Sequence, residues 1–128
     1  MTLILIALGG AAGSVLRYIA GGLIQHLSPR GYPVGTLSVN VLGCLLIGML
    51  AQLFLNVQTS GPMRALLMVG FCGGFTTFSA FSHETAGLVE GGEYVRAGVY
   101  ILLSVTLCLA ATFAGMGAVR AMHALNVR

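Results

Sequence analysis

Four long apolar segments constrain this chain more than any other feature of its sequence. They cover approximately residues 2–24, 34–55, 63–89 and 98–122, and only short linkers separate them. A helix needs roughly 20 apolar residues to cross the hydrocarbon core of a bilayer, and each segment reaches that length. We therefore predict an all-α integral membrane protein with four transmembrane helices that form a single membrane domain, residues 1–128.

The composition agrees with a membrane protein and argues against several other classes. Hydrophobic residues make up 57% of the chain and charged residues 7%, whereas soluble domains carry about 25% charged residues. The net charge of +3 is spread too thinly to indicate nucleic-acid binding. No nucleophile–base pair or metal-ligand cluster is visible, so the sequence predicts no enzyme activity. The first segment lacks a basic start and exceeds a signal core in length, so we expect a mature helix there.

The third segment contains an anomaly at its centre, Gly70–Ser82. Glycines, hydroxyl residues and phenylalanines stand where a spanning helix usually carries Leu, Ile and Val. We predict a helix break at Gly73-Gly74, near mid-membrane, where a break survives only if protein or a wet cavity covers its backbone groups. Such a break would free carbonyl oxygens near Gly73 and Thr76. Carbonyl oxygens suit a hard cation, although ordered water is an equal alternative on the sequence alone.

Polar residues also occur at membrane depth in the first two segments. Thr36 and Asn40 are four residues apart and share a helix face. The Asn40 amide either bonds a neighbouring helix or lines a site. Arg17 either draws anions toward a mouth with its fixed charge, or snorkels or caps helix-end carbonyls. Glu84, after the anomalous stretch, is expected to pair with an arginine or to lie near an aqueous mouth.

A ladder of polar side chains runs along the fourth segment at steps of four residues: Tyr100, Ser104, Cys108 and Thr112. Ser and Thr alternatively bond their own helix backbone. In the third segment, Phe78 and Phe81 are three apart and are expected to face the same space. Aromatic rings have a positive edge, so such a pair is either ordinary packing or the lining of an anion path.

Glycines and cysteines in the spans are expected to be packing residues. The chain has 19 glycines, and small residues let membrane helices approach closely. The expected close-packing positions on the first two helices are Gly9, Gly10, Gly13, Gly21, Gly22, Gly43 and Gly48. The three cysteines, Cys44, Cys72 and Cys108, lack the paired spacing of a zinc or redox site.

The basic residues, all arginine, divide equally between the two sides of the membrane. Alternating spans place Arg64, Arg120 and Arg128 on one side and Arg17, Arg30 and Arg96 on the other. Cytoplasmic loops normally carry an excess of Lys and Arg, so the balance predicts insertion in both orientations. The alternative is a fixed topology with a weak bias. Two inverted copies would form an antiparallel dimer, comparable to the inverted repeats of transporters.

At these residues the chain resembles the Fluc family of fluoride channels, also called CrcB proteins. The most specific match is Gly70–Ser82 with Glu84, which reads GFCGGFTTFSAFSHE. Supporting matches are GTLSVN at 35–40 and the pattern GxxGSxxRY at 10–18. The chain departs from the family pattern at three positions: Phe75 replaces the more usual Leu, Ala80 the usual Thr, and Cys108 a hydroxyl residue of the ladder.

The resemblance implies a fluoride-selective channel for passive export from the cytoplasm. It implies an antiparallel dual-topology homodimer with two separate pores, in a prokaryotic plasma (inner) membrane, with lipid and fluoride but no nucleic acid as partners. It also implies a structural Na⁺ at the dimer axis. The implied pore residues are Thr36, Asn40, Phe78, Phe81, Tyr100 and Ser104, with Arg17 at the vestibule and the backbone carbonyls of Gly73 and Thr76 on Na⁺.

Two other functions compete with this interpretation. Proton-coupled exporters of the small multidrug-resistance type are also short four-span dimers, but they need a membrane-embedded carboxylate. The first segment here contains no acid, only Arg17, and the chain has no Trp. A non-transporting membrane scaffold would use its polar residues only for packing. The polar ladder and the predicted helix break argue against that alternative.

Overall fold

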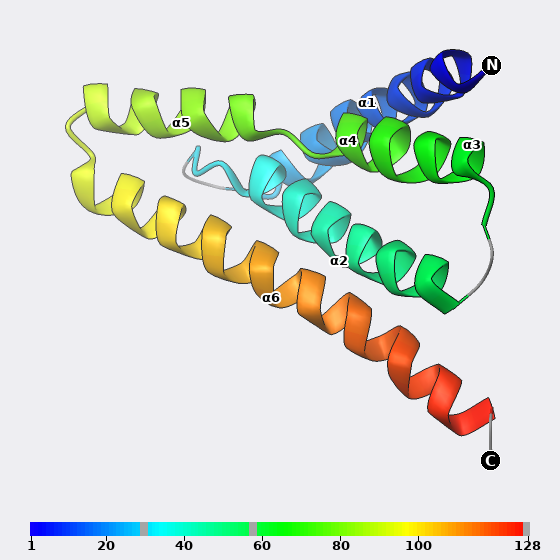
Figure 1. Cartoon of the computed structure of the whole chain (residues 1–128). Helices are drawn as coiled ribbons and strands as arrows, with labels where there is room; N and C mark the ends of the chain where they lie inside the picture. Colours follow the sequence, from blue (N-terminus) through cyan, green and yellow to red (C-terminus); the bar gives the residue numbers. More distant parts are fainter. Residues whose placement is uncertain (29–30, 57–58, 127–128) are drawn as a thin grey trace.

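The computed structural model describes residues 1–28, 31–56 and 59–126, and every regular element within those ranges is a helix (Figure 1). The first two spans are α1 (Thr2–Gln25) and α2 (Val34–Asn56). The fourth is α6 (Tyr94–Asn126). The third is assembled in chain order from α3 (Gly61–Arg64), the π-helix η1 (Ala65–Cys72), α4 (Gly73–Phe75) and α5 (Phe78–Glu90).

The four predicted spans are confirmed. Helices long and apolar enough to cross a membrane run over Thr2–Gln25, Val34–Leu55, Gly61–Glu90 and Tyr94–Leu125. The fourth begins earlier than predicted because the turn before it is short. Gly92 has a φ of 76°, and the Gly92 and Glu93 amides donate to the Val89 and Leu88 carbonyls. This Schellman arrangement ends α5 at once and lets α6 start at Tyr94.

The break in the third span is real, but its predicted position at Gly73-Gly74 is wrong. Gly73 and Gly74 are helical, in α4, whereas Thr76 and Thr77 are extended, with φ/ψ of −91°/156° and −150°/114°. Threonine hydroxyls stabilise the interruption on both sides. Thr76 Oγ1 donates to the Cys72 carbonyl at 3.0 Å, and Thr77 Oγ1 accepts from the Ala80 amide at 3.1 Å as the N-cap of α5.

Gly74 is needed for close packing rather than for the break. A Cβ atom on Gly74 would lie 2.5 Å from the Gly10 carbonyl oxygen of α1. A Cβ on Gly9 would lie 2.3 Å from the Leu66 carbonyl oxygen, and one on Gly13 would lie 2.2 Å from the Phe71 carbonyl oxygen. The predicted close contacts at Gly9 and Gly13 are therefore confirmed. Backbone packs on backbone along the whole interface between α1 and the third span.

The other predicted glycine positions divide by helix. On α2, a Cβ on Gly43 would lie 2.3 Å from Thr76 Cγ2, and one on Gly48 would lie 2.2 Å from the Thr112 carbonyl oxygen, so both are confirmed. Gly10 and Gly21 have only ordinary contacts for an added Cβ, at 3.8 Å, and Gly22 has none within 4 Å. Close packing at those three positions is not required within this chain.

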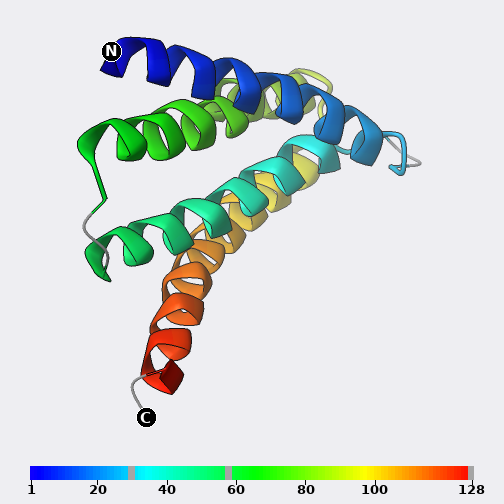
Figure 2. The ribbon, with the colours of Figure 1, turned by 90° about the vertical axis from the view of Figure 1, so that its right-hand side faces the viewer.

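The helix α6 runs beside α2 and extends past it, as the two perpendicular views show (Figures 1 and 2). Its 33 residues correspond to about 50 Å of helix, longer than the ~30 Å hydrocarbon core. The C-terminal part of α6 diverges from α1 in Figure 2. An α6 of this length has to tilt or to project from the membrane.

Two arginines from other helices, Arg64 of α3 and Arg120 of α6, donate hydrogen bonds to the C-terminal part of α2. The Arg64 guanidinium donates to the Phe54 carbonyl and lies 5.6 Å from the centre of the Phe54 ring. Arg120 Nε donates to the buried Gln52 Oε1 at 2.8 Å. These cations satisfy groups near a helix C-terminus, where positive charge is favourable.

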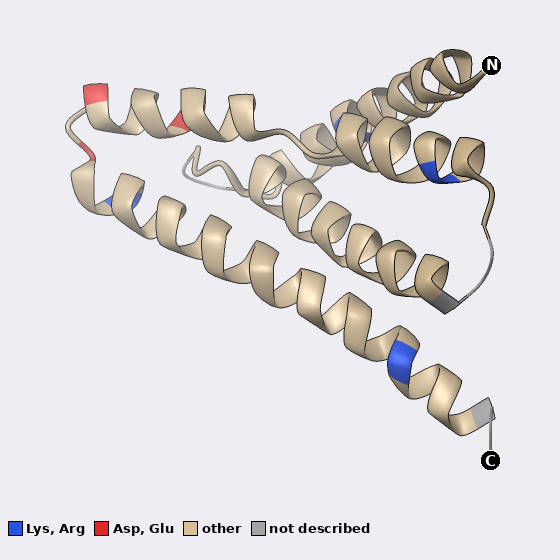
Figure 3. Cartoon of the chain, viewed as in Figure 1, with Lys and Arg blue, Asp and Glu red and all other residues tan. Residues whose placement is uncertain are grey.

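Among the described arginines, Arg64 and Arg120 contact the C-terminal part of α2 and Arg17 contacts the break, whereas the acidic residues lie on α5 and the turn after it (Figure 3). Arg96 forms an ion pair with Glu93 at that turn. Arg30 and Arg128, which entered the predicted charge balance, lie outside the described residues. The balance itself, and the insertion in both orientations that follows from it, therefore stay a prediction from the sequence.

The backbone contact at Gly13 generates a stability prediction. Gly13→Ala adds one methyl group that would lie 2.2 Å from the Phe71 carbonyl oxygen, so α1 and the third span have to move apart. We expect a loss of about 1–3 kcal/mol, the usual cost of overpacking. Circular dichroism during thermal unfolding in detergent measures the change.

Gly22→Ala is the matched control, because its added methyl meets nothing within 4 Å. Alanine favours a helix over glycine, so this variant should unfold at the same temperature or higher. Equal melting temperatures for the two variants would contradict the packing account.

Candidate functional site

The Asn40 side chain bridges α2 to the break in the third span. Its Oδ1 accepts from the Thr77 amide at 2.7 Å, and its Nδ2 donates to the Thr77 carbonyl at 3.0 Å. In a continuous helix the Thr77 amide would bond the Gly73 carbonyl instead. Asn40 therefore replaces the helical partner that the break removes, which confirms the expectation that it bonds a neighbouring helix. We call this pair of bonds the Asn40–Thr77 clasp.

Four of the six predicted pore residues, from three spans, meet around one cavity of about 330 Å³. We call it the phenylalanine cavity. Its polar and aromatic lining includes Asn40 from α2, Phe78 and Phe81 from α5, and Ser104 from α6. Asn40 thus serves both as a structural clasp and as part of a cavity wall, so its two proposed roles are compatible.

The two phenylalanines face the same space, as their spacing predicted. The ring centres of Phe78 and Phe81 are 5.3 Å apart, and Phe81 lies 5.2 Å from the Tyr100 ring. Phe81 is buried, whereas Phe78 is 77% exposed in the single chain. A ring this exposed beside the break leaves one side of the cavity to be covered by lipid or by another molecule.

Glu84 is the centre of a second polar cluster. Its Oε1 accepts from Thr36 Oγ1 at 2.6 Å, and its Oε2 accepts from the Tyr100 hydroxyl at 2.6 Å. Hydrogen bonds to a carboxylate are short and strong, so both hydroxyls are fixed in position. The cluster connects α2, α5 and α6, and it places Thr36 and Tyr100 on one acceptor rather than on the phenylalanine cavity.

Glu84 also lines a cavity of about 350 Å³, which we call the glutamate cavity. Arg17, Thr36 and Thr77 line it as well, and Thr77 borders the phenylalanine cavity too. Of the two expectations for Glu84, the structure supports a position at a cavity. Among the described residues, its recorded partners are hydroxyls and no arginine.

Arg17 caps helix-end carbonyls, one of the alternatives that were left open. Its Nε donates to the Gly74 carbonyl at 3.1 Å, and Ser14 Oγ donates to the same oxygen at 3.4 Å. In an uninterrupted helix that carbonyl would accept from the Phe78 amide. Arg17 is therefore a cap on the broken helix, and because it lines the glutamate cavity its charge also faces that space.

The polar ladder of α6 divides into different environments. Tyr100 bonds Glu84, while Ser104 and Cys108 line the phenylalanine cavity. The buried Ser104 hydroxyl has no hydrogen-bond partner within the described part of the chain. Thr112 Oγ1 donates to the Cys108 carbonyl of its own helix at 3.1 Å, so this residue behaves as an ordinary helix threonine.

The break also determines which backbone oxygens are available to a cation. The Thr77 amide donates to Asn40, so the Gly73 carbonyl loses its helical donor. Gly73 is also exposed in the single chain. Among the described residues, no group of three or more His, Cys, Asp and Glu is placed to hold a metal. A cation at the break would therefore rely on carbonyl oxygens, the donor type that Na⁺ as a hard cation accepts.

Sequence reasoning missed the hydroxyl partners of Glu84 and the roles of Thr77 and Tyr32. Thr77, Phe81 and Glu84 follow each other at steps of four and three, the spacing of one helix face, and this signal was present in the sequence. Tyr32 precedes α2, and its ring packs edge-on to Tyr100 with a centroid distance of 5.7 Å. Burial raises the pKa of Tyr32 above its ordinary value, partly offset by the positive charge of Arg96.

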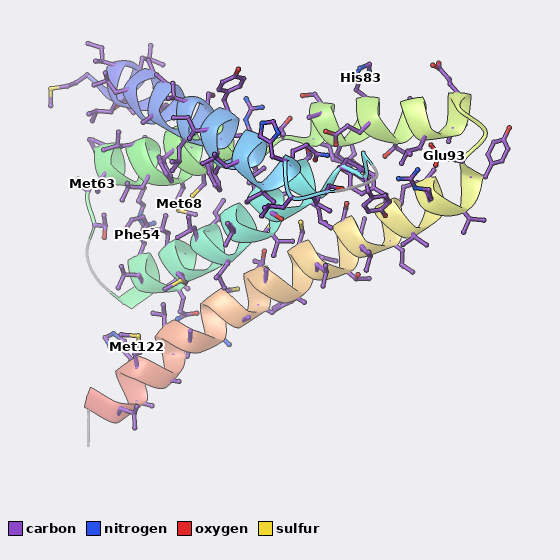
Figure 4. The ribbon with its side chains drawn as sticks, turned by 180° about the vertical axis from the view of Figure 1, so that it is seen from behind. Phe54, Met63, Met68, His83, Glu93 and Met122 are labelled. Carbon is purple, nitrogen blue, oxygen red and sulfur yellow. The ribbon has the colours of Figure 1, made fainter. Side chains whose placement is uncertain are left out.

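His83 and Phe54 lie outside both cavities. Figure 4 shows His83 on the outer side of α5, pointing away from the other helices. It is exposed. Phe54 points from α2 toward the third span in the same view, where Arg64 covers it.

Comparison with known proteins gives consistent matches along nearly the whole chain. The chain is 50% identical over 120 residues to a protein of Rhizobium etli, covering 93% of this chain and 96% of that protein. It is 47% identical over 120 residues to a protein of Geobacter sulfurreducens, covering 93% and 97%. A protein of Coxiella burnetii is 45% identical over 119 residues, covering 91% and 95%. Each of these relatives is named "Fluoride-specific ion channel FluC".

The family-level match covers all four spans as far as the middle of α6. The sequence model described as "CrcB-like protein, Camphor Resistance (CrcB)" matches residues 4–116. This range includes the Asn40–Thr77 clasp and the linings of both cavities. Together with the identities above, it shows that the chain belongs to the CrcB family.

Proposed function

We propose that this protein is a fluoride-selective ion channel that lets cytoplasmic F⁻ leave the cell passively. The observation that carries the proposal is the 50% identity, over more than nine-tenths of both chains, to a relative named as a fluoride-specific channel. The same relationship favours a channel over a proton-coupled exporter of the small multidrug-resistance type. It also favours an ion-conducting role over a scaffold or an enzyme.

The phenylalanine cavity has the chemistry that an anion path requires. Ring edges of Phe78 and Phe81 carry partial positive charge without a full cation that would hold F⁻ too tightly. Conduction requires sites that are strong enough to admit the ion and weak enough to release it. Ser104 supports this role, because its buried hydroxyl has no hydrogen-bond partner among the described residues and can donate to a passing anion.

Asn40 completes the pathway while it maintains the clasp. Its Nδ2 uses one N–H for the Thr77 carbonyl, which leaves the second N–H of the amide for another acceptor. In this proposal that acceptor is F⁻. Thr36 and Tyr100 do not contact the ion directly in this proposal, because their hydroxyls donate to Glu84. They orient Glu84 and, through the Tyr100 ring, the neighbouring Phe81.

The glutamate cavity is the proposed vestibule. Arg17 faces it with a permanent positive charge, which raises the local concentration of anions. Because Arg17 is also bound to the Gly74 carbonyl, its guanidinium stays in position instead of snorkelling into water. Thr77 lines both cavities and marks the point at which the vestibule meets the phenylalanine cavity.

The working unit in this proposal is an antiparallel homodimer in the prokaryotic plasma (inner) membrane, with two separate pores. The exposure of Phe78 and Gly73 beside the break supports it, because a second chain would cover both. The balanced arginines support insertion in both orientations. A structural Na⁺ at the axis would be held by the carbonyls of Gly73 and Thr76 from each chain, where it would neutralise the partial negative charge of these oxygens.

Efflux from proteoliposomes tests the function. Vesicles containing the purified protein are loaded with potassium fluoride or potassium chloride, and external anion is followed by ion-selective electrodes after valinomycin is added. We expect fluoride to leave rapidly and chloride at the rate of empty vesicles, because the relative at 50% identity is named as a fluoride-specific channel. Equal release of both anions, or of neither, would contradict the proposal.

The two orientations generate a separate prediction. A protease-sensitive tag fused after Arg128 should be cleaved in roughly half of the molecules of sealed inverted membrane vesicles. Adding three lysines after Arg128 should shift the population, because juxtamembrane positive charge is retained in the cytoplasm. Cleavage of all molecules or of none in the parent protein would show a single orientation and exclude the antiparallel dimer.

A further inference from the structure

Two thiols from different helices line the phenylalanine cavity. They are Cys44 of α2 and Cys108 of α6. Neither is in a disulfide. Cys72 differs from both, because it is 1% exposed and is not part of the cavity wall.

The helix packing explains why these thiols are close. A Cβ on Gly48, one turn after Cys44, would lie 2.2 Å from the carbonyl oxygen of Thr112, one turn after Cys108. A Cβ on Gly115 would lie 2.3 Å from the Leu45 carbonyl oxygen. The two helix backbones are therefore in contact directly beside the thiols, and α2 and α6 run in the same direction (Figure 1). The separation between Cys44 and Cys108 is set by backbone contacts rather than by flexible side chains.

Ser104 provides an independent indication that this cavity accepts a ligand. It lies one turn before Cys108 on the same face of α6, it is 7% exposed, and it lines the same cavity. Its hydroxyl has no partner in the described residues. An unpaired buried hydroxyl is costly, so a guest that contacts its oxygen recovers part of that cost.

We propose that Cys44 and Cys108 form a two-thiol binding site for a soft, thiophilic metal ion inside the phenylalanine cavity. Thiolates are the ligands that select soft cations such as Cu⁺, Ag⁺ and Hg²⁺. These ions accept two sulfur ligands in a line, so a third protein ligand is not required. The Ser104 oxygen is a weak additional donor.

With mercuric chloride as the reagent, binding exchanges the chloride ligands of mercury for thiolates. Two thiols react with HgCl₂, two S–H bonds and two Hg–Cl bonds break, and two S–Hg bonds form. Two protons and two chloride ions are released, and nothing is oxidised or reduced. The neutral reagent can enter an apolar protein interior, where the free Hg²⁺ ion would be strongly disfavoured.

The consequence for transport rests on the proposed function. A metal ion held between Cys44 and Cys108 would occupy the space next to Asn40, Phe81 and Ser104. We therefore expect one equivalent of HgCl₂ per chain to stop fluoride efflux, and an excess of a dithiol to restore it.

The binding test is independent of transport. Detergent-purified protein is titrated with HgCl₂, and the ultraviolet charge-transfer absorption of S–Hg bonds is recorded together with the protons released. We expect the absorption to saturate at one Hg²⁺ per chain, with two protons released. Cys44→Ser and Cys108→Ser should each release only one proton per Hg²⁺, because a single thiol replaces one chloride and leaves the other on the metal.

Cys72→Ala is the control, and it should titrate as the parent protein does. The proposal is overturned if Cys72→Ala lowers the release of two protons per Hg²⁺, or if Cys44→Ser and Cys108→Ser still release two. Size-exclusion chromatography and circular dichroism identify variants that do not fold, and Cys44→Ala and Cys108→Ala then replace them. Metal binding without a block of efflux would support the site and would place the fluoride path elsewhere.

Discussion

The two hydrogen bonds between the Asn40 side chain and the Thr77 backbone stabilise the break in the third span. Without them, an extended residue at membrane depth would leave an amide and a carbonyl unsatisfied. Each such group costs about 1–3 kcal/mol when buried. The clasp removes this cost, and it also fixes where α5 begins and which way Phe78 and Phe81 point. The positions of both cavities depend on it, because Thr77 borders each of them.

Close backbone contacts provide the frame on which the clasp acts. The glycines of α1 bring its backbone onto η1 and α4, and Gly48 and Gly115 do the same between α2 and α6. Arg17 and Ser14 then satisfy the Gly74 carbonyl from α1, on the opposite side of the break from Asn40. Side chains from both α1 and α2 therefore satisfy backbone groups at the break. Its remaining open side, with Gly73 and Phe78, is the side that we propose a second chain covers.

Much of this arrangement could be predicted from the sequence, because hydropathy and spacing are local signals. The four spans and the shared space of Phe78 and Phe81 were predicted correctly. The break was predicted, but it was assigned to the glycine pair Gly73-Gly74. The structure uses Gly74 for close packing and leaves Gly73 exposed, and the extended residues are Thr76 and Thr77.

What could not be predicted depends on contacts between distant segments. Glu84 was recognised as a polar residue at depth, but its two hydroxyl donors come from residues 36 and 100, and no local pattern names them. Similarly, the ladder on α6 was regular in sequence, yet Thr112 bonds its own helix while Ser104 faces a cavity. Helix periodicity gives the face of a residue, but the neighbouring helices determine what that face meets.

The central claim is that the clasp positions the ion path, and Asn40→Leu tests it most directly. Gln52→Leu is the matched control, since Gln52 is a buried amide on the same helix that bonds Arg120 rather than the break. Fluoride efflux from proteoliposomes, measured for protein that elutes as the parent does, is the readout. We predict at least a tenfold loss of efflux for Asn40→Leu and near-parental efflux for Gln52→Leu. Parental efflux from Asn40→Leu would contradict the account.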